Sequence, residues 1–245
     1  MEKNNKSKIL LSLSLFTAGL MLLPLLFSSC GKTGNINPVE AKIEYQVLNL
    51  SYDILPVNLY IDFLRQNTSP FNYPTASGYF SLNTIDTPFQ IRSANTGSVV
   101  NLLTIDSTKL SRRTRYSLFI TGSRVSNTLA YIFTVDTSTV PRVGRGKLRF
   151  VNAALPVGGT GSGLDLTANG TEAFVAQKYK EVSEYIELSA GLYNLRIGPT
   201  ADKSKTLAEL KRTAIEDGKL YTIYTYGLAG RTDTAAFGAA ILTNR

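Results

Sequence analysis

The chain has 245 residues, of which 43 % are hydrophobic and 18 % are charged, and its formal net charge is +8. It contains no histidine and only one cysteine, Cys30. This composition excludes serine triads that use histidine, Cys–His dyads and zinc sites built on several His or Cys ligands. It also excludes an intramolecular disulfide, so stability must come from a hydrophobic core.

The N-terminus has the order of a secretory signal. Lys3, Lys6 and Lys8 precede an apolar stretch over residues 9–27. That stretch ends in Leu-Leu-Phe-Ser-Ser before Cys30, which resembles a lipobox. We therefore expect residues 1–29 to be a lipoprotein signal peptide, cut between Ser29 and Cys30, with diacylglycerol on Cys30.

The alternative is an uncleaved membrane anchor, because residues 9–27 approach the roughly 20 apolar residues that can span a bilayer. Ser12, Ser14, Thr17 and Pro24 dilute the stretch and favour processing. Residues 30–39 are small and polar and predict a flexible tether. We expect the protein to be lipid-anchored at the outer membrane. The sequence does not resolve whether it faces the periplasm or the cell surface.

From Ile43 onward, apolar residues recur at every second position, as at Val57, Leu59, Ile61 and Phe63. A period of two predicts half-buried strands, and the turn residues between such runs are typical of β-sandwiches. Residues 206–214 are rich in helix formers. We nevertheless predict a strand there, because the matching segment 99–105 is rich in β-branched residues and tertiary context overrides weak propensity.

That match is one part of an internal repeat. Tyr73 aligns with Tyr179 (179 − 73 = 106), and residues 116–122 align with 221–227 at nearly the same offset. Residues 47–49 align with 150–152. Such collinear matches indicate a duplicated domain. The predicted fold is all-β, with two tandem Ig-like antiparallel β-sandwich domains at 40–137 and 146–245, joined by a linker at 138–145.

The second half resembles the DUF4397 family, an extracytoplasmic β-sandwich domain of unknown function that is common in lipoproteins of the Bacteroidota. The resemblance lies in the segments 147–153 and 163–166, the corner at 188–193, and the late strand at 218–223. It implies fold and location only. At the turns of this pattern, Gly191 and Gly218 should take positive φ. Tyr185, Tyr193 and Tyr221 should bury their rings, each with its hydroxyl on a backbone partner.

No catalytic or metal site, and no cofactor, is predicted. The basic cluster 111–115 is best interpreted as a solvated hairpin turn rather than a nucleic-acid stripe. The glycine-rich run 158–163 lacks the spacing of a phosphate loop and is interpreted as a loop between strands. Glu181, Glu184 and Glu187 do not share one strand face, so they do not form the carboxylate pair of a glycosidase.

Two weaker sites follow from single patterns. Tyr224 and Tyr226 share one strand face and would form a ligand platform if that face were exposed, whereas a buried sandwich face is the alternative. Asp106-Ser107-Thr108 and Asp233-Thr234-Ala235 resemble short O-glycosylation signals on Ser107 and Thr234.

The resulting expectation is a non-enzymatic, lipid-anchored envelope protein with a structural or adhesive role. Its partners would be the membrane, through lipid on Cys30, and envelope glycans or other envelope proteins, but not nucleic acid. The alternative is a glycan- or peptide-binding lipoprotein of an uptake or attachment system. A hydrolase is a third class, and it would require carboxylates clustered in a cleft.

Overall fold

The computed structural model describes residues 43–61, 63–82, 88–95, 97–105, 110–156 and 163–245. The chain divides into two compact units, residues 1–40 and 41–245, and every described residue belongs to the second. The predicted signal peptide, the cleavage site at Ser29 and Cys30, and the tether lie outside the described residues. Within the described part, no helix is long and apolar enough to cross a membrane.

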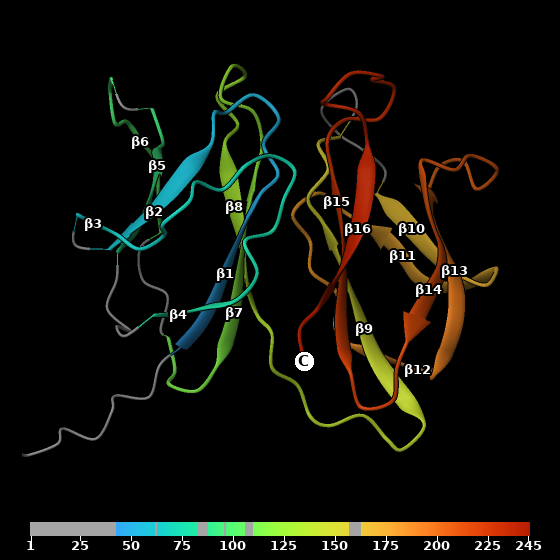
Figure 1. Cartoon of the computed structure of the whole chain (residues 1–245). Helices are drawn as coiled ribbons and strands as arrows, with labels where there is room; N and C mark the ends of the chain where they lie inside the picture. Colours follow the sequence, from blue (N-terminus) through green and yellow to red (C-terminus); the bar gives the residue numbers. More distant parts are fainter. Residues whose placement is uncertain (1–42, 62, 83–87, 96, 106–109, 157–162) are drawn as a thin grey trace, which may run out of the picture. The chain divides into compact units, whose positions relative to one another are not determined.

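The first half of the second unit forms two four-stranded sheets (Figure 1). Inner sheet 1 has the order β4-β1-β7-β8 and outer sheet 1 the order β3-β2-β5-β6. The strands are β1 (Ile43–Asn49), β2 (Val57–Ile61), β3 (Leu64–Arg65), β4 (Phe80–Leu82), β5 (Phe89–Ser93), β6 (Asn101–Ile105), β7 (Arg115–Thr121) and β8 (Ala130–Val135).

The second half forms two more four-stranded sheets. Inner sheet 2 has the order β12-β9-β15-β16 and outer sheet 2 the order β11-β10-β13-β14. The strands are β9 (Arg145–Asn152), β10 (Leu164–Ala168), β11 (Thr171–Gln177), β12 (Ile186–Ser189), β13 (Gly191–Pro199), β14 (Ala208–Ile215), β15 (Leu220–Tyr226) and β16 (Gly238–Thr243). The all-β fold with two sandwiches is thus confirmed.

The two sandwiches have one topology. Adding eight to each strand number of the first half reproduces the sheet orders of the second half. One feature differs from the antiparallel prediction: β1 pairs with β7 in parallel, and β9 pairs with β15 in parallel. The period of two in the sequence fixes which residues share a face, but it carries no information on strand direction.

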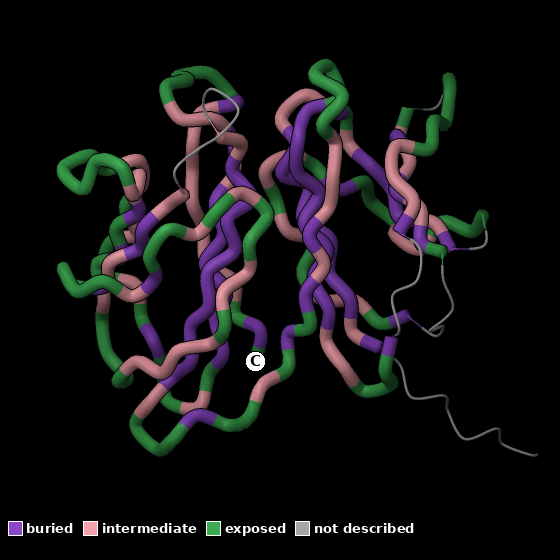
Figure 2. Tube along the Cα trace, turned by 180° about the vertical axis from the view of Figure 1, so that it is seen from behind, coloured by how far each residue is buried: buried purple, intermediate pink, exposed green. Residues whose placement is uncertain are grey.

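Alternation explains where the cores lie. In β7, Leu118 and Ile120 point into the core between inner and outer sheet 1, and Phe119 points to the opposite face. In β15, Ile223 joins the core of the second sandwich and Tyr224 faces away from it. Figure 2 shows buried residues along most of the length of the central strands, as expected when both faces of the inner sheets are covered.

Shared hydrogen bonds confirm the repeat at the level of single atoms. Ser77 Oγ accepts from the N–H of Val47 at 3.0 Å, and Ser183 Oγ accepts from the N–H of Phe150 at 2.8 Å. In the same way, Asn49 Nδ2 donates to the backbone carbonyl of Phe71, and Asn152 Nδ2 donates to that of Gln177. The acceptors lie 22 and 25 residues after the two asparagines.

The predicted corner residues follow expectation in part. Tyr221 is buried, and its hydroxyl accepts from the N–H of Glu216 at 3.1 Å. Tyr193 donates to Ser189 O at 2.9 Å, but the hydroxyl of Tyr185 reaches a side chain instead of the backbone. Gly218 has a φ of +74° as predicted. Gly191 does not take positive φ, because it already forms the first extended residue of β13.

Residues 208–215 form strand β14. The strand predicted for the segment that is rich in helix formers is therefore confirmed. The strand pairs with β13 from Gly191 to Ile197. Leu210 packs against the second core and Ile215 belongs to it. Tertiary packing therefore outweighs the helix propensity of its alanine, glutamate, leucine and lysine residues.

Candidate functional site

The two inner sheets contact each other through a third apolar cluster. Leu48 and Phe119 of the first sandwich meet Val151 and Tyr224 of the second, and the rings of Phe119 and Tyr224 lie 5.9 Å apart. Leu48, Phe119 and Val151 are fully buried. Residues that would face solvent in an isolated sandwich are thus removed from water by the neighbouring repeat.

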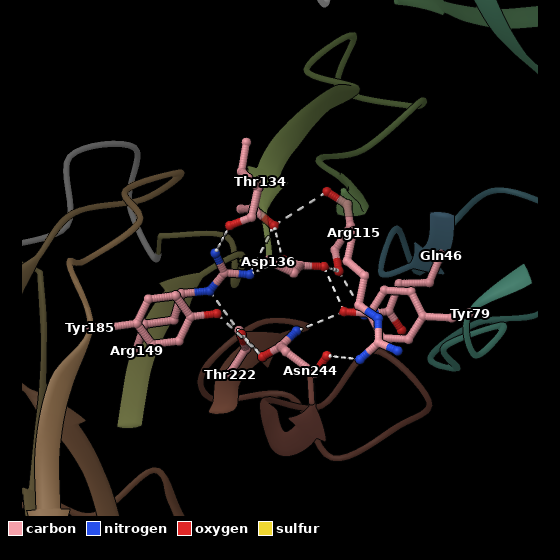
Figure 3. A network of polar contacts seen from close by, with 11 residues as sticks. Gln46, Tyr79, Arg115, Thr134, Asp136, Arg149, Tyr185, Thr222 and Asn244 are labelled. Atoms are coloured by element: carbon pink, nitrogen blue, oxygen red, sulfur yellow. Dashed lines mark hydrogen bonds and ion pairs between the residues drawn. The ribbon is translucent and has the colours of Figure 1, made fainter. Parts of the chain in front are cut away.

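Beside this cluster lies a buried polar network centred on Asp136 and Arg149 (Figure 3). Asp136 follows β8, whereas Arg149 is in β9 and its guanidinium forms an ion pair with the Asp136 carboxylate. The side chains are 0 % and 4 % exposed. Arg149 also donates to Thr134 Oγ1 at 3.0 Å and to Val135 O at 2.8 Å, so it holds the end of β8 directly.

Every remaining polar atom of the pair is bonded. Asp136 also accepts from the hydroxyls of Ser117, Thr134 and Tyr79. Arg149 Nε donates to Thr222 Oγ1 at 2.8 Å. A buried ion pair becomes tolerable when further hydrogen bonds of this kind satisfy both partners.

Asn244, which follows β16, joins the same network. Asn244 is fully buried, donates to the Tyr79 hydroxyl at 2.9 Å and accepts from Thr222 Oγ1 at 2.6 Å. Burial first, and then the charge of Asp136, raise the pKa of Tyr79 well above its usual value. Tyr79 therefore stays protonated and donates to the carboxylate. The network locks β8, β9 and the C-terminal residues together, and its role is structural.

The structure places the predicted tyrosine platform inside this contact. Tyr224 and Tyr226 do share a face of β15, opposite to the core of their own sandwich, but Tyr224 is only 4 % exposed. Tyr226 is half-buried beneath Tyr73, with 6.1 Å between the ring centroids. Burial raises the pKa of Tyr224 to about 12. The face is covered by the first repeat, so Tyr224 has no open ring for a ligand.

Of the two predicted glycosylation residues, Thr234 is exposed in the loop between β15 and β16. In that loop the Asp233 carboxylate accepts from the N–H of Ala235 at 3.1 Å. Ser107, like the predicted lipidation residue Cys30, lies outside the described residues. Among the residues that the structure describes, no group of three or more His, Cys, Asp and Glu side chains could hold a metal ion.

An exposed aromatic tip lies at the turn between β2 and β3. The alternating pattern placed Phe63 on the inward face of a strand, but β2 ends at Ile61 and Phe63 lies in the turn before β3, where it is 76 % exposed with a φ of +65°. A bulky residue at positive φ is a genuine backbone outlier. The equivalent turn of the second sandwich, between β10 and β11, has Asn169 and Gly170 at positive φ, the usual residues for this geometry.

Arg92 of β5 supports this tip. Its guanidinium carbon lies 4.8 Å from the centroid of the Tyr60 ring and 5.1 Å from that of Phe63. Arg92 Nε donates to Gln90 Oε1 at 3.0 Å, which fixes the plane of the guanidinium. One face of Phe63 is thus packed against a cation, and the exposed remainder of the ring is held in a fixed position. The sequence does not mark this turn as one with positive φ, because neither glycine nor asparagine occupies it.

The second sandwich has a small hollow of about 170 Å³, whose lining includes Pro156 and Gly163. Apolar side chains predominate in its lining, among them Leu155, Leu164 and Phe237, and Tyr179 is also present. The run 158–162, which the sequence placed in a loop, lies outside the described residues. The hollow is smaller than the 300 to 1,000 Å³ or so typical of sites for drug-sized molecules.

The family described as "Domain of unknown function (DUF4397)" matches this chain over residues 44–159 and again over residues 160–244. The first match runs past β9, so the border between the two matches is not the border between the two sandwiches. No curated protein matches the chain.

Three solved structures share weak similarity with the chain. The first is CBMbc of family CBM26 from Eubacterium rectale Amy13K, in complex with maltoheptaose, with 8 % identity, a TM-score of 0.23, and coverage of 82 % of this chain and 96 % of that one. A proposed cell adhesion protein from Bacteroides eggerthii has 9 % identity, a TM-score of 0.21, and coverage of 83 % and 95 %. A leucine-rich repeat protein from Bacteroides thetaiotaomicron has 14 % identity, a TM-score of 0.19, and coverage of 78 % and 26 %.

Proposed function

The chain belongs to the DUF4397 family, and we propose that it is a non-catalytic binding or adhesive protein, held at the outer membrane by a lipid on Cys30. In this proposal the two sandwiches act as one rigid body at the end of the tether formed by residues 30–39. The signal-like N-terminus, with three lysines before an apolar stretch and Cys30, supports the lipid anchor.

The observation that supports the binding role is the buried contact between the two sandwiches. This contact consists of the ion pair of Asp136 and Arg149 and the adjoining apolar cluster. Tandem domains joined only by a linker move relative to each other by default. In our proposal the buried contact between the sandwiches suppresses that motion. A rigid body presents its loops and strand edges at fixed positions, and this reduces the entropic cost of binding a large partner.

The anchor is tested by labelling cells with an alkyne fatty acid and comparing the wild type with Cys30→Ala. We expect labelling that the variant loses. Surface protease added to the same cells separates the two orientations: digestion of the wild type indicates display on the cell surface, and protection indicates a face toward the periplasm. An unlabelled wild-type protein would contradict the anchor.

A second candidate function is glycan or peptide binding at the tip formed by Tyr60, Phe63 and Arg92. The observation that favours it is the positive φ of the exposed Phe63. Strained residues of this kind persist where the surrounding structure enforces them, and they cluster at ligand-binding positions. A ring with one packed face and one open side suits stacking against a sugar ring or an apolar side chain.

This second function is tested by affinity electrophoresis in gels that contain neutral or acidic polysaccharides. We expect one class of polymer to retard the wild type and not Phe63→Ala. Leu192→Ala is the control, because Leu192 is also exposed, at 54 %, but lies in the second sandwich. Equal retardation of the wild type and Phe63→Ala would exclude the tip as a glycan site.

A further inference from the structure

The outer sheets of the two sandwiches end in equivalent edge strands, β6 and β14. The edge of β14 is charged, with Glu209, Lys211 and Arg212 among its eight residues. By contrast, residues 98–105, which contain β6, have no charged residue. The two edges therefore occupy the same place in the fold but differ completely in charge.

Charged side chains on an edge strand prevent it from pairing with another strand. β14 has this protection and β6 lacks it. The residues that lead into β6 are apolar and open to solvent: Val99 is 52 % exposed and Val100 is 38 % exposed. In the described part of the chain, β6 pairs with β5 and no other strand. An uncharged, β-branched edge with one side unpaired is a template for strand addition.

We propose that residues 98–105 pair antiparallel with the same residues of a second copy of this chain. A two-fold axis at the middle of the segment would place residues 101 and 102 opposite each other's copies and the ends of the segment, residues 98 and 105, opposite one another. Because the segment has no charges, no like charges oppose each other in such a pair. The same arrangement at β14 would bring Lys211 of each copy against Arg212 of the other, so that like charges oppose each other.

The charge pattern thus favours a second copy as the occupant. The paired edges would join two copies of outer sheet 1 into one continuous sheet, with the order β6-β5-β2-β3 running outward from each side of the axis. The inference depends on neither the lipid anchor nor a ligand at Phe63.

The test uses the full-length chain in cells, with a photo-cross-linking amino acid in place of Asn101, an exposed residue of β6. We expect light to give a product of twice the chain mass, whose cross-linked peptide comes from residues 98–105 of the other copy. The same substitution at Thr213 of β14 is the matched control and should give no such product. A product that contains a different protein, or no product from position 101, would overturn the proposal.

A second variant separates pairing from misfolding. Val99→Lys with Val100→Lys adds charge at two exposed positions and should abolish the cross-linked dimer while leaving the thermal midpoint unchanged. Val175→Lys, at a residue that is 46 % exposed on the edge strand β11, should leave the dimer intact. A dimer that persists in the double-lysine variant contradicts pairing through this edge.

Discussion

In both sandwiches, a serine in the segment before the fourth strand accepts a hydrogen bond from the backbone of the first strand: Ser77 from Val47 and Ser183 from Phe150. The same two sandwiches differ in the turn between their second and third strands and in one edge strand of their outer sheets. The first has Phe63 at its tip and an uncharged edge at β6, where the second has Gly170 and the charged strand β14. Hydrogen bonds that hold the fold together, which we call the framework, occur in both sandwiches. Features that only one sandwich has are therefore attributed to recognition rather than to folding.

The largest expected effect comes from breaking the contact between the sandwiches. Arg149→Ala leaves the Asp136 carboxylate buried without its cation, and this should lower the free energy of unfolding by about 3 to 5 kcal/mol. Urea denaturation of the wild type and the variant measures the loss. Arg231→Ala is the control, because its ion pair with Asp233 is exposed, and its midpoint should not move. If both variants had the same urea midpoint, the network would not have a structural role.

The next prediction breaks the framework in each copy separately. Asn49→Ala and Asn152→Ala each remove a buried donor to a backbone carbonyl, at a cost of about 1 to 3 kcal/mol. Asn152 should cost slightly more, because its Oδ1 accepts from Thr225 Oγ1 at 3.0 Å, whereas the Oδ1 of Asn49 accepts from the N–H of Ser51 at a longer 3.4 Å. Thermal denaturation measures both. If only one of the variants is destabilised, the two asparagines are not equivalent framework residues.

The turns between the second and third strands of the two sandwiches differ in backbone strain. Gly170 has a φ of +83° and its missing Cβ would meet nothing, so Gly170→Ala tests backbone strain alone and should cost about 1 to 2 kcal/mol. Phe63→Gly relieves the same strain but loses the contact with Arg92, worth about 0.5 to 1 kcal/mol at an exposed site. We expect its unfolding free energy to stay within about 1 kcal/mol of the wild type. A large loss in Phe63→Gly would mean that this residue is needed for folding.

The smallest effect is a pH dependence specific to the first sandwich. Partial burial raises the pKa of Asp53, but hydrogen bonds from the Ser123 hydroxyl and the N–H groups of Arg124 and Val125 outweigh it, and the net pKa lies below 3.8. A lowered folded-state pKa contributes stability above the unfolded value, and that stability is lost as the pH falls through the folded value. The wild type should therefore exceed Asp53→Asn in urea midpoint at pH 7, and the gap should close below about pH 3.8. A gap that persists at acid pH would contradict this role for Asp53.

Much of the fold was predictable from alternation and the repeat. The match to residues 99–105 predicted a strand even at residues 206–214, and the matched serine and asparagine positions in the two halves make equivalent hydrogen bonds. Strand direction was not predictable, because the parallel pairs β1·β7 and β9·β15 show the same alternation as antiparallel ones.

The candidate sites were less accessible to sequence reasoning. Arg149 alternates with the core residues Leu148 and Phe150, a pattern that normally places the charged side chain in solvent. The neighbouring sandwich buries it together with Tyr185, whose ring centroid lies 4.9 Å from the guanidinium carbon of Arg149. The same contact covers Tyr224, which alternation placed correctly on the face opposite to Ile223 without indicating what that face would meet. Phe63 was misplaced because nothing in its apolar pattern signals a turn.

Native-state hydrogen exchange tests most directly the claim that two copies of one framework form a single rigid body. The central amides of β7 and β15 report on the two sandwiches separately. If the contact through Asp136 and Arg149 joins them into one cooperative unit, both sets of amides should exchange with the same free energy of opening in the wild type, and their values should separate in Arg149→Ala. Different opening free energies in the wild type would show that the sandwiches open independently, and would contradict the account.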